Sequence, residues 1–536
     1  MKRETGYGRR ETVALARWGT LSSALVFSVF CLPSPVSGSW QCPDGSPPPC
    51  AGRPARAAAA ATSVAVLYFD NASSDSADSY LADGITEEII SRLGEVGRLQ
   101  VKSRYLVRRY RGSAAENPQT IGRQLAVASI VTGSVRRAGN RLRVTAEMVR
   151  TTTGDVIWSE RYDRANSDVL SLQEDLASAV ATAITGRLLP SEQRAIAVQP
   201  TRNPAAWDHF LRGNAALAQR TSAAYARALT EYETAARLDP GFSRALARVA
   251  YVYGVASWRS ERVNGLEPDS SWRLAEAAAS RAIRSNGSLS DNWLALGLAQ
   301  MQRPESVAAG RLSLERAVSL DSTNAEAWHV YAWVLFYQGR NSEAVAAWRR
   351  AVAIEPGRPI TLSMLGWYET YAGQWAEAER WLDSALVLDP GFMQVIRIRA
   401  FTRLGRGDTA GARLDIARMS SSTGTPLLGS SAADSTFGRI GRGILAAIAG
   451  DSMPLRTELS RQVLMLERLD DPLIVYVATG YAVLGEPDRA LDVLERARWK
   501  NTNYYVNVLL WPFDRLRGLP RYERFLDEWR VPAGVR

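Results

Sequence analysis

The sequence predicts an α+β N-terminal domain, with a mixed sheet covered by helices, followed by an all-α superhelical solenoid. Two observations support this prediction. Apolar residues alternate with a period of two in short stretches between 63 and 162, whereas helical segments recur at a constant spacing from about residue 203. The chain of 536 residues is too long for one ordinary core, and its 46% hydrophobic and 22% charged residues are typical of a folded protein.

The chain is basic, with a formal charge of +10. Nearly all of this positive charge is arginine, scattered beside Asp and Glu along the expected helices. No basic stripe and no nucleic-acid-reading motif accompanies the charge. We therefore expect no nucleic-acid binding.

Residues 1–38 have the features of a secretory signal. Basic residues up to Arg17 precede an apolar run from Leu21 to Leu32, and small residues follow it. The alternative is an uncleaved membrane anchor, because no charged residue lies between Arg17 and Asp44. Both interpretations predict an exported protein, either periplasmic or anchored and facing outside the cytoplasm. Membrane contact is expected only through this segment, if it stays uncleaved.

Residues 39–62 form a linker with one pair of cysteines. The third cysteine, Cys31, lies in the apolar run and would leave with the signal. In an oxidising compartment Cys42 and Cys50 can form a disulfide, and the alternative is two unpaired thiols. With one such pair and only two histidines in the chain, we expect no metal ion and no cofactor.

The α/β domain is expected over residues 63–195. Its hairpin signal is Gly139-Asn140, a tight turn between two alternating stretches, and a third strand follows Gly154. A helix over 82–93 is indicated by apolar residues at helical spacing. The full set of expected elements comprises strands at 63–69, 99–101, 128–135, 141–149 and 156–162, and helices at 82–93, 120–125 and 169–188.

Four motifs in this domain carry a family resemblance: Val64–Asn71, Leu81–Glu88, Gly133–Arg136 and Trp158–Asp163. With them, the segment from Val64 to about Leu189 resembles the FlgO-like and TolB amino-terminal-like modules of bacteria. Such modules often precede helical repeats, and in many relatives a kinase, cyclase or DNA-binding domain lies ahead of them. Because only about 60 residues precede the module here, we expect that half to be absent. The resemblance implies an architecture and no particular chemistry.

The second part of the chain is a repeat array. Ala317, Ala351 and Ala385 occupy the same position in successive segments, 34 residues apart. That period, with small residues where helices approach closely and proline after the second helix, is typical of tetratricopeptide repeats (TPRs). The array is expected over 203–422, with further TPR-like repeats and a C-terminal cap over 436–536. Eight repeats are expected to begin near residues 207, 242, 291, 325, 359, 393, 436 and 471.

The sequence shows no catalytic motif. It contains no phosphate-binding glycine loop after a strand, and its two histidines, His209 and His329, show no triad spacing. Glu87 and Glu88 are adjacent on a helix and point apart. Asp70 and Asn71 follow a strand, where sheets place ligands, but a turn accounts for both. We therefore expect a protein that is not an enzyme.

The first helix of each repeat is expected to line a concave groove. In the fourth and fifth repeats this groove is aromatic, with little charge, and lacks the Lys, Asn and Arg set that clamps a C-terminal carboxylate. Such a groove suits a peptide or helix partner, although the same rings could be core between repeats. The candidate partner-binding residues are His329, Trp333, Phe336, Ser363, Trp367 and Tyr371.

The sequence therefore predicts a non-catalytic exported TPR protein for protein–protein interaction or scaffolding in the cell envelope. One alternative is a regulatory or sensor partner of a separate kinase or adenylate cyclase system. Another is an enzyme with an unrecognised site in the α/β domain. The fragments 63–195 and 203–536 are each expected to fold alone.

Overall fold

The computed structural model describes most of the chain. The expected signal segment 1–38 and the Cys42–Cys50 pair lie outside the described residues. Within them, no helix combines the length and the apolar character that crossing a membrane requires. The described ranges are 61–112, 117–219, 221–258, 263–303, 305–420, 431–464, 471–496 and 512–528.

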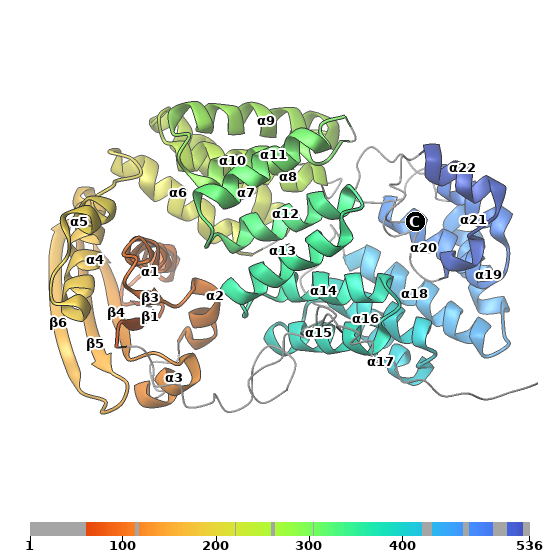
Figure 1. The fold of residues 1–536 in the computed structure, drawn as a ribbon, viewed down its shortest axis with the longest axis horizontal. Coiled ribbons are helices and arrows are strands. Elements are labelled where there is room, and N and C mark those ends of the chain that lie inside the picture. Colours follow the sequence, from red (N-terminus) through yellow and green to blue (C-terminus); the bar gives the residue numbers. More distant parts are fainter. Residues whose placement is uncertain are drawn as a thin grey trace, which may run out of the picture. The chain divides into compact units, whose positions relative to one another are not determined.

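A small mixed sheet forms the N-terminal part, as the alternating stretches predict (Figure 1). Its strand order is β3-β1-β4-β5-β6, and β2 pairs with β4. β1 runs parallel to β3 and β4, whereas β4, β5 and β6 pair antiparallel. The strands are β1 (Ser63–Val66), β2 (Asp70–Asn71), β3 (Gln100–Val101), β4 (Ser129–Ala138), β5 (Arg141–Arg150) and β6 (Val156–Ala165).

The predicted hairpin turn is confirmed. β4 and β5 pair along their whole length, from Ser129 with Arg150 to Ala138 with Arg141, which leaves a two-residue loop. Gly139 in that loop has φ of +57°, a backbone conformation that glycine adopts without steric cost.

Helices cover both faces of the sheet. α1 and α4 pack with β5 in one apolar cluster, and α3 packs on the other face of β1. The sequence did not predict α2 and η2, the two short elements that follow β3, because three or four residues are too few to show a helical period. The helices are α1 (Ser79–Gly94), α2 (Arg104–Val107), its continuation η2 (Arg108–Tyr110), α3 (Pro118–Leu125), α4 (Val169–Thr185) and α5 (Pro190–Ile196).

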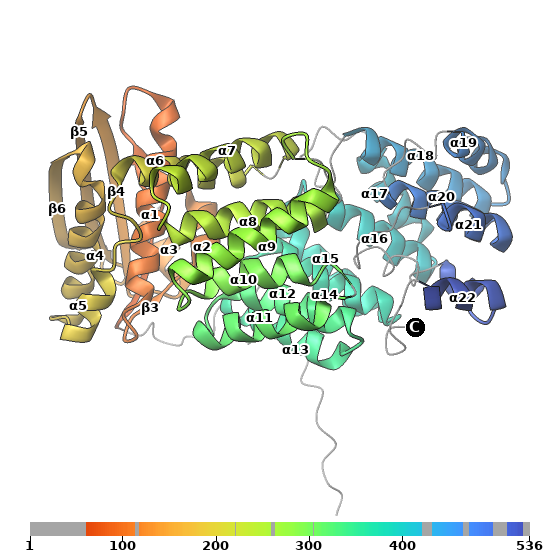
Figure 2. The same ribbon diagram turned by 90° about the horizontal axis from the view of Figure 1, so that it is seen from above.

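The rest of the described chain is helical and consists of successive antiparallel pairs, consistent with a solenoid (Figures 1 and 2). The pairs are α6 (Pro204–Leu217) with α7 (Ser222–Leu238), α8 (Ser243–Trp258) with α9 (Pro268–Ser285), α10 (Ser290–Gln300) with α11 (Val307–Leu320), α12 (Ala325–Tyr337) with α13 (Asn341–Ile354), α14 (Pro359–Tyr371) with α15 (Trp375–Leu388), α16 (Met393–Arg406) with α17 (Thr409–Ser420), α18 (Ser431–Ile448) with α19 (Met453–Val463) and α20 (Asp471–Val483) with α21 (Pro487–Leu494). A single turn, η6 (Phe513–Leu516), and α22 (Pro520–Glu528) follow.

The 34-residue period has a direct packing basis. α12, α14 and α16 begin 34 residues apart, and the alanines that fix the period are buried against neighbouring helices. The turn between the two helices of each of these pairs contains a glycine with positive φ, where a side chain would be strained. These glycines are Gly339, Gly373 and Gly407, at +73°, +71° and +87°.

The part of the chain from β1 to α5, residues 63–196, which we call the sheet module, packs directly on the first repeat, α6 with α7. A Cβ atom on Gly84 of α1 would lie 2.6 Å from Cδ2 of Leu211 in α6, so the two helices are in close contact. Buried Glu88 pairs with Arg92 at 2.9 Å and with Arg244 of α8 at 3.1 Å. One hydrophobic core runs from the sheet through α1 into the first repeats, across the boundary expected near 196–204. A cut there would expose apolar surface.

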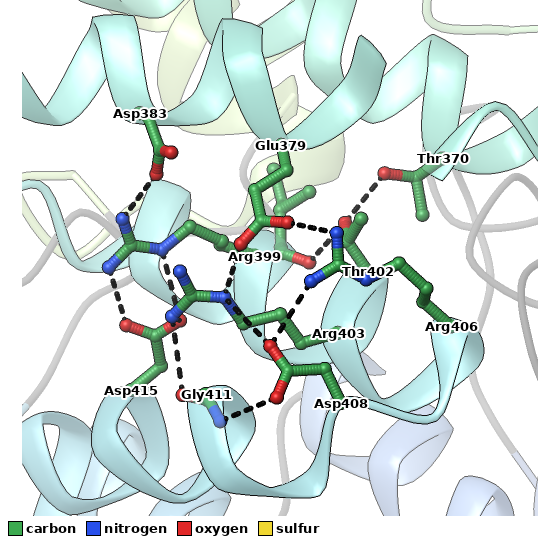
Figure 3. Close-up of polar contacts among 11 residues, drawn as sticks. Thr370, Glu379, Asp383, Arg399, Thr402, Arg403, Arg406, Asp408, Gly411 and Asp415 are labelled. Carbon is green, nitrogen blue, oxygen red and sulfur yellow. Dashed lines mark hydrogen bonds and ion pairs between the residues drawn. The ribbon is translucent and has the colours of Figure 1, made fainter. Parts of the chain in front are cut away.

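A buried network of charges joins α15, α16 and α17 (Figure 3). Asp415 is only 1% exposed. Arg399 donates to both oxygens of Asp415, at 3.0 and 2.6 Å, and Arg403 donates to it at 2.9 Å. Asp383 and Glu379 on α15 pair with the same two arginines, at 2.6 and 2.7 Å. The network therefore ties the fifth and sixth helix pairs together.

Candidate functional site

A cavity of about 210 Å³ lies where the sheet module meets the helical repeats. We call it the junction cavity. The sheet module supplies four of the lining residues and the repeats supply the others. Most of the repeat residues lie on the first helices of pairs one to six. The lining residues are Tyr68, Glu87, Arg104, Arg108, Asn214, Leu217, Ala218, Tyr225, Arg248, Tyr251, Val255, Trp258, Leu298, Met301, Glu326, His329, Val330, Trp333, Arg358, Ile360 and Gln394.

One acidic side chain of the junction cavity is held within the sheet module. Glu87 on α1 accepts a hydrogen bond from the Tyr68 hydroxyl at 2.9 Å and pairs with Arg104 at 3.4 Å. Burial, followed by the charge of Glu87, raises the pKa of Tyr68, so this phenol stays protonated and donates.

The other acidic side chain is held within the repeats. Glu326, in the first turn of α12, pairs with buried Arg358, the residue before α14. It also accepts a hydrogen bond from the Tyr251 hydroxyl of α8 at 3.3 Å. These contacts link the first helices of three repeats across the concave side. They also leave both acids of the cavity engaged with groups of the protein itself.

Aromatic rings form the apolar wall of the cavity. Trp258 and Trp333 meet edge to face, with centroids 5.8 Å apart, and the Trp258 indole donates to the Tyr337 hydroxyl at 3.1 Å. Val255 and Val330 lie beside these rings in the lining. The cavity thus offers guanidinium groups and a large apolar surface to one ligand.

The structure places the six candidate partner-binding residues in two groups. His329 and Trp333 line the junction cavity; the other four do not. Five of the six are buried, and Tyr371 is half-buried. The rings of Trp333 and Trp367 contact each other at 5.6 Å, and Phe336 packs on Trp367 at 5.2 Å. Ser363 donates to the carbonyl of Ile360 in its own helix at 2.8 Å.

This burial has a physical cause: large rings at the same position of successive repeats fill the gap between them. Their packing favours the core interpretation for Phe336 and Trp367, and partner binding by the six residues stays a prediction. Burial also lowers the pKa of His329 to about 3, so its imidazole is neutral, with Nδ1 at 3.3 Å from the Thr361 hydroxyl.

The expectation of a groove with little charge differs from what the junction cavity shows. It contains four arginines and two glutamates. Arg248 lies on α8, a first helix that the sequence mapping did not include, and Arg358 directly precedes α14, where the mapping considered only residues within the helix. Arg104 and Arg108 belong to the unpredicted α2–η2 turn. No local sequence signal could identify Arg104 and Arg108 as cavity residues, because the module and the repeats that meet at the cavity are far apart in the sequence.

Among the residues that the structure describes, no group of three or more His, Cys, Asp or Glu side chains could hold a metal ion.

Family comparison agrees with the helix-pair geometry. A model of the tetratricopeptide repeat family matches residues 325–358, which span α12, α13 and Arg358. The chain carries a tetratricopeptide repeat array. The TPR period predicted from the spaced alanines is therefore confirmed, and the junction cavity lies on the side that the first TPR helices line.

One relative is similar over about half of the chain. It is "Putative adenylate cyclase 3" of Rhizobium meliloti (strain 1021), 34% identical over 262 residues. The match covers 48% of this chain and 43% of that protein, so the chain spans less than half of the relative's length.

Several solved TPR structures are similar at low levels. The APC/C hetero-tetramer Cut9-Hcn1 has 11% identity and a TM-score of 0.42, over 68% of this chain and 63% of that one. The human IFIT1 dimer with m7Gppp-AAAA has 15% identity and a TM-score of 0.40, over 62% and 85%. A thermophilic TPR protein of Thermus thermophilus has 18% identity and a TM-score of 0.32, over 37% and 100%. These scores are too low to support an inference about function.

Proposed function

We propose that this protein is a non-catalytic TPR protein that binds a peptide segment of a protein partner in the junction cavity. The observation that carries the proposal is the cavity's position. Helices from several repeats and the sheet module converge on it, so a bound segment would contact both parts of the chain. Its mixture of rings and charged groups is typical of surfaces that hold a peptide by anchor side chains.

The test is to fill the cavity and compare the result with a matched surface change. Val255→Trp adds a large ring to the half-buried lining, whereas Val387→Trp adds the same ring at a position that is 71% exposed. We expect Val255→Trp to weaken peptide binding at least tenfold, because an anchor pocket is occupied. Val387→Trp should bind like the parent protein. Equal binding by both variants, with equal helicity by circular dichroism, would contradict the proposal.

The named relative supports a second candidate function. A protein similar to half of this chain bears the name "Putative adenylate cyclase 3", which favours a regulatory or sensor role beside a separate kinase or cyclase. The purified chain incubated with ATP and Mg²⁺ should form no cyclic AMP. Formation of cyclic AMP would contradict a non-catalytic role, whereas a change in the rate of an added partner cyclase would favour the sensor role.

We also propose that the protein is exported and acts in the cell envelope. The basic start and apolar run of residues 1–38 and the Cys42, Cys50 pair support this. Mass spectrometry should find a mature N-terminus at Ser39 and a disulfide between the two cysteines. An intact N-terminus with both thiols free, in cytosolic protein, would contradict export. The FlgO-like and TolB-like resemblance of the sheet module stays a prediction.

A further inference from the structure

Among the described residues, two arginines of the junction cavity have no carboxylate within hydrogen-bond distance of their guanidinium groups. The side chain of Arg108, exposed on η2, makes no hydrogen bond or ion pair with any described residue. The guanidinium of Arg248 on α8 has one acidic neighbour, Asp291, whose Oδ2 atom is 3.8 Å from Nη2. That distance is too long for a hydrogen bond. A guanidinium carries five N–H donors, so Arg248 has donors to offer to a ligand.

Arg248 is also sheltered from water. Its side chain is only 23% exposed. The pKa of Arg248 is lowered by burial and raised by the charges of Asp291 and Tyr232. The charge of Arg104 lowers it again, and the net shift is upward. Arg104 of the sheet module and Arg248 of the second repeat line the same cavity, where their like charges repel each other. An anion placed between them would replace this repulsion with two attractions.

The two glutamates of the cavity do not supply the anion between Arg104 and Arg248. Glu87 is engaged by Tyr68 and Arg104, and Glu326 by Arg358 and Tyr251. The cavity therefore retains a surplus of arginines over glutamates, and Asp291 offsets part of the charge of Arg248. Next to this surplus lie Val255, Val330 and the indole rings of the apolar wall.

We propose that the junction cavity recognises a carboxylate of the bound peptide, held by Arg248 and Arg104 with Arg108 nearby, and an adjacent apolar side chain against the indole wall. This inference deepens the peptide-binding function proposed above and rests on it. Guanidinium groups bind carboxylates through paired, charge-assisted hydrogen bonds, which gives both affinity and orientation. Because the arginines come from the sheet module and from a repeat, the carboxylate also bridges the two parts.

The experiment uses the full chain and four pools of fluorescein-labelled nonapeptides, read by fluorescence anisotropy. Three amidated pools carry Glu, Gln or Lys at the central position, with neutral residues randomised elsewhere. The fourth pool carries central Gln and a free C-terminal carboxylate. We expect the Glu pool or the free-carboxylate pool to bind at least tenfold more tightly than the amidated Gln pool, and this comparison tells which carboxylate is read.

Arginine variants assign the preference to the cavity. Arg248→Gln and, because its position is exposed and tolerant, Arg108→Gln should reduce the carboxylate preference. Arg350→Gln, at an exposed position on α13, should retain it. Pools that bind without preference, or a preference that survives both cavity changes, would overturn this inference while leaving peptide binding intact. Failure of every pool to bind would refute the proposed function itself.

Discussion

Replacing the buried carboxylate of Asp415 tests whether the charge network stabilises the fifth and sixth repeats. Asp415→Asn keeps the side-chain volume but removes the negative charge that faces Arg399 and Arg403 (Figure 3). Both arginines are themselves largely buried, at 12% and 15% exposure. The change therefore leaves two sheltered positive charges with less compensation than before.

The expected magnitude follows from this burial. Removing one partner of a buried ion pair typically costs about 3–5 kcal/mol. Arg399 keeps Asp383 and Arg403 keeps Glu379, so we place the loss near the lower limit, at about 3 kcal/mol. Asp383→Asn is the matched control. Its carboxylate pairs with Arg399 but is 50% exposed, so its loss should cost about 1 kcal/mol or less.

Hydrogen exchange of the full chain measures this effect locally, because repeat arrays open in parts rather than as one unit. Asp415→Asn should reduce amide protection in α15, α16 and α17 by about a hundredfold, which corresponds to about 3 kcal/mol. Asp383→Asn should change it less than tenfold. Equal, small effects of both variants would refute the claim that buried charges hold these repeats together.

Three further predictions concern the module contact and the aromatic core. Gly84→Val should overpack α1 against Leu211 and destabilise the chain by about 1–3 kcal/mol in thermal unfolding, whereas Gly94→Val, with open space around it, should avoid this clash; equal losses would argue against the tight contact. His329 has a folded-state pKa of about 3 against about 6.5 unfolded, so its contribution to stability is lost as pH falls below about 6.5, by up to about 1.4 kcal/mol per pH unit. Urea titrations at pH 7 and pH 5 should therefore show a smaller difference in the free energy of unfolding between the parent and His329→Gln at pH 5. An equal difference at the two pH values would contradict this prediction. Trp367→Ala should cost about 3–5 kcal/mol in urea unfolding because its ring is buried; intact stability with lost peptide binding would instead make the ring a contact residue.

Local signals made the main elements predictable. The alternation around Gly139-Asn140 predicts the β4–β5 hairpin, since a tight turn and two alternating strands are encoded in neighbouring residues. The alanines at 34-residue spacing predict the helix pairs for the same reason. α2 was not predictable, because its four residues are positioned by packing beneath the sheet.

The site was only partly predictable, because it depends on contacts between distant segments. Of the six candidate residues, His329 and Trp333 line the junction cavity. The degree of burial of the aromatic rings could not be predicted, since it depends on how the ring of one repeat packs against the ring of the next. Arg104 and Arg248 line the same cavity because α1 packs on α6, and no sequence period encodes that contact.

Photo-crosslinking tests the central claim most directly, because it reports where a peptide binds. The tightest-binding member of the favoured peptide pool would carry a diazirine beside its carboxylate, and adducts on the full chain would be mapped by mass spectrometry. We expect adducts within Arg248–Trp258 and Glu326–Trp333, on the lining of the junction cavity. Adducts confined to second helices such as α13, or to β6, would contradict it.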